Sequence, residues 1–206
     1  FMMPLYCRIK TLTMVLFIAL TIGSCASKNY LVVNYQLPSE TIRAKETEIV
    51  LIFKDQRAEQ AIVTQSAKMA LKDFSGNFAL IVTSDSKNER LVGAFSLSSL
   101  MKSIFTQRLK NAGIRVASED QGQATALEII LKAFKLDLVE RKWVVQMSYQ
   151  ANFLKHNRFV SGETITGNAE RLRVVGSKDA EKVIGELMTD AVNRLDLDAL
   201  FRSAGN

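Results

Sequence analysis

Two kinds of hydrophobic spacing divide the chain into strands and helices. Segments 48–54 and 78–83 are short, nearly continuous apolar runs rich in β-branched residues, which predicts two buried strands. Segment 143–154 alternates apolar and polar side chains over its whole length, which is typical of an antiparallel strand with one buried face. Segments 126–139 and 158–169 flank it and are also predicted to be strands. Only three residues separate each of these last three strands from the next, so we expect antiparallel hairpins.

Segments 96–111 and 177–194 instead place their apolar residues three and four positions apart, which predicts two amphipathic helices. Gly113 followed by Ile114 predicts that the first helix ends in a Schellman turn, and Ser177 is a candidate cap for the second. The order of elements is then β-β-α-β-β-β-α. We therefore predict an α+β fold, with a mostly antiparallel sheet of about five strands and the two amphipathic helices on one face.

The N-terminal 25 residues follow a different pattern. Arg8 and Lys10 precede an apolar run, 11–22, which ends close to the small residues Gly23 and Ser24. A helix made of this run would be about 18 Å long, well short of the 30 Å hydrocarbon core of a bilayer. A permanent transmembrane helix is therefore disfavoured, and the pattern favours a cleavable signal peptide over residues 1–24.

The end of this segment, Ile22-Gly23-Ser24-Cys25, resembles the bacterial lipobox. The resemblance implies cleavage before Cys25 and a lipid on its thiol, with 25–46 as lipidated N-terminus and tether, and 47–206 as one periplasmic α+β domain. Ala26 follows, where an Asp would favour the inner membrane, so we expect outer-membrane sorting. The other thiol, Cys7, would be lost with the leader, so the mature domain would have no disulfide.

Charge and motifs narrow the classes of function. The net charge is +6, but it is scattered, whereas nucleic-acid binding needs a clustered basic face. The chain has no P-loop, dinucleotide fingerprint or G-x-S-x-G motif, and its one histidine, His156, lies in an expected turn. We therefore expect no enzymatic activity, no cofactor, no metal site and no nucleic-acid partner.

Two groups of charged residues remain as candidates for a site. Asp55 and Arg57 follow a predicted buried strand, and we expect a charge-assisted pair that fixes the next turn; a role in docking a partner is the alternative. Asp196 and Asp198 are spaced like a carboxylate pair, but they alternate with leucines at an expected helix end. We interpret them as solvent-exposed residues without a catalytic role.

Taken together, these segments make nearly all of the chain resemble the YajG-like lipoprotein family. The resemblance rests on the lipobox, the strand that leads into Asp55-Gln56-Arg57 with Gln60 and Ala61 behind it, the helix ending at Gly113, the three-strand meander, and Ala191-Val192-Asn193 in the last helix. It implies a lipidated periplasmic domain and no particular activity.

Three hypotheses of function follow. The first is a non-enzymatic accessory module in envelope assembly or maintenance, held to the membrane by lipid on Cys25 and contacting an envelope protein. This module would have an apolar patch or a free sheet edge. The second is a binder of a small ligand, lipid or glycan in a pocket between sheet and helices. The third, a cell-wall hydrolase, would need converging carboxylates, for which the sequence offers little.

Overall fold

The computed structural model describes residues 29–39, 48–84, 88–117 and 125–202. The strands are β1 (Tyr30–Gln36), β2 (Glu48–Asp55), β3 (Asn77–Thr83), β4 (Glu89–Phe95), β5 (Arg115–Ala117), β6 (Thr125–Val139), β7 (Lys142–Lys155) and β8 (Arg158–Leu172). The helices are α2 (Gln65–Ala70), α3 (Leu97–Asn111), α4 (Ser177–Asn193) and α5 (Leu197–Arg202). All the strands and both helices that the hydrophobic spacing predicts are confirmed.

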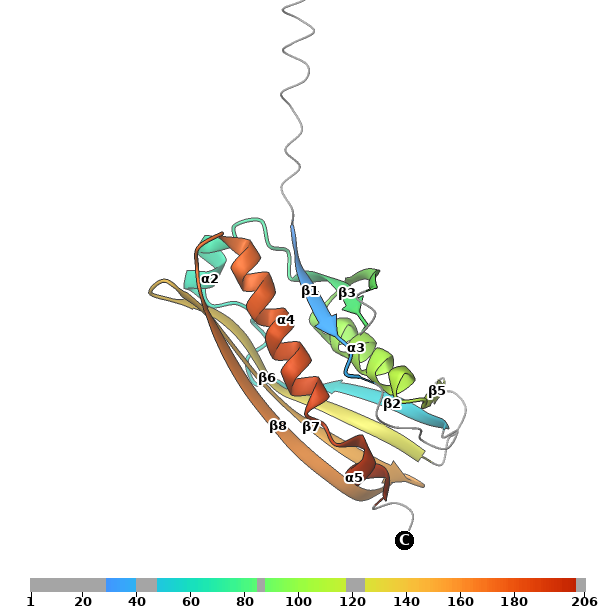
Figure 1. The fold of residues 1–206 in the computed structure, drawn as a ribbon. Coiled ribbons are helices and arrows are strands. Elements are labelled where there is room, and N and C mark those ends of the chain that lie inside the picture. The colour runs from blue at the N-terminus through green and yellow to red at the C-terminus, as the bar shows by residue number, and fades with distance from the viewer. Residues whose placement is uncertain (1–28, 40–47, 85–87, 118–124, 203–206) are drawn as a thin grey trace, which may run out of the picture.

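These strands form two sheets. The larger has the order β5-β2-β6-β7-β8, in which β2 is parallel to β5 and β6, while β6, β7 and β8 form antiparallel hairpins. The smaller has the order β1-β3-β4, with β1 parallel to β3 and β3 antiparallel to β4. Figure 1 shows the long strands β6, β7 and β8 curving along one side of α4, with β1 on its other side. The expected α+β fold is confirmed, and the helices lie on one face of the larger sheet.

The second sheet contains elements that the hydrophobic spacing does not reveal. Segment 30–36, expected to lie in the tether, is β1, and it is paired along its whole length with β3. Its side chains alternate, with Leu31, Val33 and Tyr35 buried. The folded body thus includes a strand N-terminal to residue 47. Strand β4 is not among the predicted strands, because its charged start, Glu89 and Arg90, and Gly93 hide the strand pattern.

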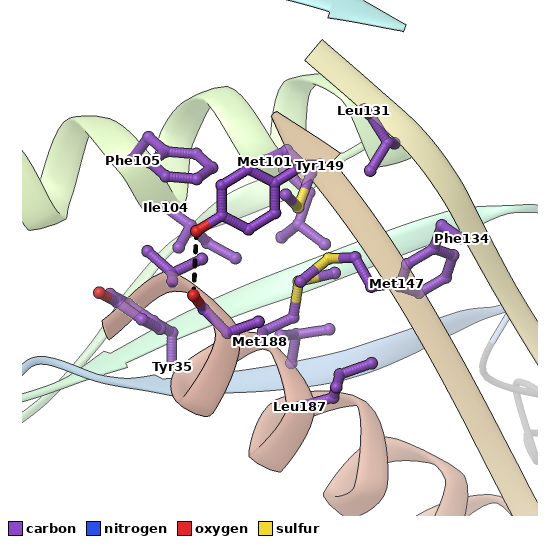
Figure 2. Close-up of a cluster of buried hydrophobic side chains, with 14 of the residues drawn as sticks. Tyr35, Met101, Ile104, Phe105, Leu131, Phe134, Met147, Tyr149, Leu187 and Met188 are labelled. Atoms are coloured by element: carbon purple, nitrogen blue, oxygen red, sulfur yellow. Dashed lines mark hydrogen bonds between the residues drawn. The ribbon is translucent and has the colours of Figure 1, made fainter. Parts of the chain in front are cut away.

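The core lies between the two sheets and is built on α3 and α4. In Figure 2, Met101, Ile104 and Phe105 of α3 surround the ring of Tyr149, which projects from β7. The Phe105 and Tyr149 rings meet edge to face at 5.3 Å, and the Tyr149 hydroxyl donates a hydrogen bond to the Ala191 carbonyl of α4 at 2.9 Å. Burial raises the pKa of Tyr149 far above its ordinary value, so the hydroxyl remains a donor.

The predicted end of α3 is confirmed, whereas the start of α4 differs from the prediction. Helix α3 ends in the expected Schellman turn: the N–H of Ile114 bonds the Leu109 carbonyl at 3.0 Å, and Gly113 has a φ of 76°. At the start of α4 the expected cap, Ser177, is instead the first helical residue, after Gly176. Asp179 in the first turn supplies the carboxylate that accepts backbone N–H groups from the loop before the helix. The expectation of a Ser177 cap is therefore wrong.

Candidate functional site

An open groove of about 720 Å³ lies between strand β1 and the polar side of helix α4. One wall comprises Val32, Asn34 and Gln36, the residues of β1 that alternate with its buried ones. The other wall is formed by α4, with Gly185 near its middle. The groove is thus a direct product of two patterns, the period-two alternation of β1 and the one-sided apolar stripe of α4.

Gly185 lets the helix approach strand β1 closely at the groove. A Cβ atom placed on Gly185 would lie 2.7 Å from the carbonyl oxygen of Asn34 and 3.3 Å from its amide nitrogen. A similar close approach occurs on the far side of α4, where a Cβ on Gly167 of β8 would lie 2.8 Å from Leu187. Glycine at these two positions allows α4 to contact both sheets.

Side chains of α4 also close the outer edge of β1. Glu181 accepts a hydrogen bond from the backbone N–H of Val32 at 3.0 Å. The hydroxyl of Thr189 accepts one from the N–H of Gln36 at 3.1 Å, and the amide of Asn193 donates to the Gln36 carbonyl at 2.9 Å. An unpaired strand edge is normally a template for another strand. Because α4 bonds the backbone of Val32 and Gln36 and packs Gly185 against Asn34 between them, this edge is covered. The groove is therefore suited to a ligand that contacts side chains and does not add a strand to the sheet.

Charges are unevenly distributed along the groove. In its second half, Glu186 pairs with Arg171, and Asp190 pairs with Arg194 at 2.9 Å. In its first half lie Lys178 and Lys182, close to the N-terminus of α4, where the helix dipole adds positive potential. The acid in this half, Glu181, is engaged by the N–H of Val32. The first half therefore favours an anionic group, while the aliphatic parts of the lining side chains offer an apolar path along the groove.

The expected pair of Asp55 and Arg57 is present. The Nε and Nη2 atoms of Arg57 donate to the two carboxylate oxygens of Asp55, both at 2.9 Å, and its Nη1 atom donates to the Gln60 carbonyl at 3.1 Å. These bonds from Arg57, with a weaker one from Ser98 of α3, hold the pKa of Asp55 below its usual range. Since only 5% of the Arg57 side chain is exposed, its guanidinium fixes the turn after β2 from within the fold. A docking role for the pair stays a prediction.

The other residues singled out from the sequence lie apart. His156 is exposed in the β7–β8 turn with a φ of 51°. Asp196 and Asp198 are exposed, and Asp196 accepts the N–H of Ala199 at the start of α5. Cys25 lies outside the described residues. Within the part of the chain that the structure describes, no three His, Cys, Asp or Glu residues gather as metal ligands, and no helix is long and apolar enough to cross a membrane.

Comparisons with known proteins support the fold. No family model matches the chain, and neither does any curated protein. A DUF330 protein from Xanthomonas campestris is similar over 84% of this chain and 95% of its own, with 10% identity and a TM-score of 0.50. Two further structures have lower TM-scores. A Caulobacter crescentus protein described as a lipoprotein has 11% identity over 53% of this chain and 84% of its own, with a TM-score of 0.39. A homolog of a neuraminyllactose-binding hemagglutinin from Helicobacter pylori has 9% identity over 83% and 97%, with a TM-score of 0.44.

At these identities, the likeness to the Xanthomonas campestris protein establishes a shared fold and carries no activity with it. The resemblance to the YajG-like family stays a prediction.

Proposed function

We propose that this protein is an outer-membrane lipoprotein whose periplasmic domain serves as a non-enzymatic binding module of the cell envelope. The observation that carries the proposal is the lipobox ending at Cys25, five residues before β1 begins at Tyr30. A signal peptide, an acylated cysteine and a folded domain follow one another directly in this order. Ala26 beside the cysteine supports sorting to the outer membrane.

The groove between β1 and α4 favours a ligand-binding role over a purely structural one. Its volume, about 720 Å³, lies within the range of small-molecule sites, which run from about 300 to 1,000 Å³. Its basic half suits an anionic headgroup, and its apolar path suits an acyl chain or a similar apolar body. We therefore favour an anionic amphiphile as ligand; docking of an envelope protein on the same domain is the second candidate.

The anchor and its destination are tested together by separating inner and outer membranes by density. We expect wild-type protein in the outer membrane and the Ala26→Asp variant shifted to the inner membrane. The Cys25→Ala variant should remain at its full precursor mass. Wild-type protein recovered in soluble periplasm, or unchanged distribution of all three proteins, would refute the proposal.

The ligand role is tested by extracting lipid from purified protein and identifying it by mass spectrometry. Asn34→Trp would fill the groove from β1 with an exposed side chain, so we expect it to reduce the extracted lipid several-fold. The matched control is Phe159→Trp, an exposed position on β8 outside the groove. Equal recovery from both variants and wild type would argue against the groove as the site.

A further inference from the structure

Large exposed apolar side chains gather at one end of the domain. Val174 and Val175, in the loop between β8 and α4, are 79% and 57% exposed. Leu172, at the end of β8, and Val139, at the end of β6, are exposed as well, and both are paired with Lys142 of β7 in the sheet register. They therefore flank Lys142 on the same face of the sheet. We name this region the apolar end. It consists of the apolar residues Val139, Leu172, Val174 and Val175 and the basic residues Arg141, Arg173 and Lys178.

Backbone hydrogen bonds hold the loop of the apolar end in place. The N–H of Arg173 donates to the Arg141 carbonyl at 2.8 Å, and the indole N–H of buried Trp143 donates to the Gly176 carbonyl at 3.0 Å. The Asp179 carboxylate accepts the N–H groups of both valines between them. The valines are thus fixed outward by bonds to their backbone, while most of their side-chain surface contacts no protein atoms. Such exposed apolar surface marks an interaction site.

Basic side chains border the exposed valines. Arg141, Arg173 and Lys178 are exposed around the loop. The acid at the end of the neighbouring strand, Glu170, pairs with Lys142 at 2.7 Å. One exposed acid, Glu140, lies beside Lys142 in the β6–β7 turn, so the basic side chains at this end outnumber the acids. The result is a small apolar surface with a border of net positive charge, which is the combination that binds the interface of a bilayer containing anionic lipid.

The length of chain before β1 brings this end close to the membrane. Tyr30 is five positions after Cys25, so even a fully extended chain spans no more than about 18 Å between them. Tyr30 shares a small cavity of about 140 Å³ with Ser177, three residues after Val174. Figure 1 shows the start of β1, the first turn of α4 and the β6–β7 hairpin at the same end of the molecule. A lipid on Cys25 would therefore hold the apolar end against the leaflet.

We propose that the apolar end is a membrane-contact surface, which inserts Val174 and Val175 into the interface of the phospholipid leaflet that holds the lipid on Cys25. The inference rests on the proposed lipid anchor. The domain would then stand with the β6–β7 hairpin at the leaflet and the β7–β8 hairpin, about 40 Å away along the 14 residues of β7, toward the periplasm.

The test measures the depth of a fluorescent label in the bilayer. The full chain carrying Cys7→Ser and Val174→Cys is purified with its lipid and reconstituted in vesicles of phosphatidylethanolamine and phosphatidylglycerol. The control carries Arg158→Cys in the β7–β8 hairpin, and Leu172→Cys is a second probe of the apolar end. Spin-labelled lipids in the same vesicles quench labels that enter the interface.

We expect quenching at Val174 and Leu172 to be several-fold stronger than at Arg158. Equal and weak quenching at all three positions would overturn the inference, and would leave a protein partner as the occupant of the apolar end. The mass of the same samples reports the anchor separately. A lipidated protein with weak quenching refutes only the contact surface, while a protein without lipid refutes the proposed function.

Discussion

Replacing Gly185 by alanine would have two opposite effects on the free energy of unfolding. The higher helix propensity of alanine would raise it, and the crowding between α4 and β1 would lower it. In the interior of a helix, alanine is normally more stable than glycine by about 1 kcal/mol. In α4, however, the new methyl group would lie 2.7 Å from the Asn34 carbonyl oxygen, which belongs to the backbone of β1. Ordinary contact needs about 3.5 Å, so strand and helix would have to separate by several tenths of an ångström.

That separation would also lengthen the hydrogen bonds that close the edge of β1. The bonds from Val32 to Glu181 and from Gln36 to Thr189 are already 3.0 and 3.1 Å long. Overpacking costs about 1–3 kcal/mol, and each weakened hydrogen bond adds a part of its net contribution of about 1 kcal/mol. After the gain in helix propensity, we expect Gly185→Ala to lower the free energy of unfolding by about 1–2 kcal/mol.

Equilibrium unfolding in urea measures this change, with the fluorescence of Trp143 as the probe. Trp143 is the single tryptophan of the chain and is fully buried, so its emission should report unfolding of the core. Lys182→Ala, an exposed change on the same helix, is the control and should alter stability by no more than about 0.5 kcal/mol. A stabilised Gly185→Ala variant would refute the close approach of α4 to β1.

Three further predictions concern buried or edge-closing polar groups. Arg57→Leu should lower the free energy of unfolding by about 2 kcal/mol, as measured by urea unfolding at neutral pH. This is less than the loss expected on breaking a fully buried ion pair, because 20% of the Asp55 side chain is exposed. Because the pKa of Asp55 is lowered in the folded state, the stability that the pair contributes is present above the ordinary Asp pKa and is lost as the pH falls through the folded value. The free energies of unfolding of wild type and Arg57→Leu should therefore converge in acid. A constant difference between them down to low pH would contradict the assignment. Tyr149→Phe should cost about 1 kcal/mol by removing the donor to the Ala191 carbonyl, and an unchanged midpoint in thermal unfolding would show that the bond contributes nothing. Thr189→Val keeps the side-chain shape but removes an acceptor at the β1 edge, so amide exchange should accelerate for the last N–H of β1 and remain unchanged in β7.

The larger sheet and both long helices were predictable because their signals are local. Strand β7 alternates along most of its length, and the short link to each neighbour, two residues in the structure, leaves room only for a hairpin. The end of α3 at Gly113 follows from a glycine that adopts a positive φ and an apolar residue behind it. The ion pair of Asp55 and Arg57 was predictable for the same reason, because the two residues are separated by one position.

The groove was not predictable, since it arises from contacts between residues about 150 positions apart. Strand β1 has a readable alternation, but its place behind a signal-like segment favoured a tether over a strand. Nothing in the local sequence shows that Glu181 and Thr189 close the edge of β1, because the same polar residues would suit any exposed helix face. Gly185, inside an otherwise regular helix, is the one local signal of close packing.

The central claim is that lipid on Cys25 holds this domain to the membrane, and intact-mass spectrometry tests it most directly. The protein is purified from membranes beside the Cys25→Ala variant. The account predicts a wild-type mass equal to residues 25–206 plus acyl chains, and an unlipidated variant. A wild-type mass that retains residues 1–24, or one that lacks lipid, would contradict it.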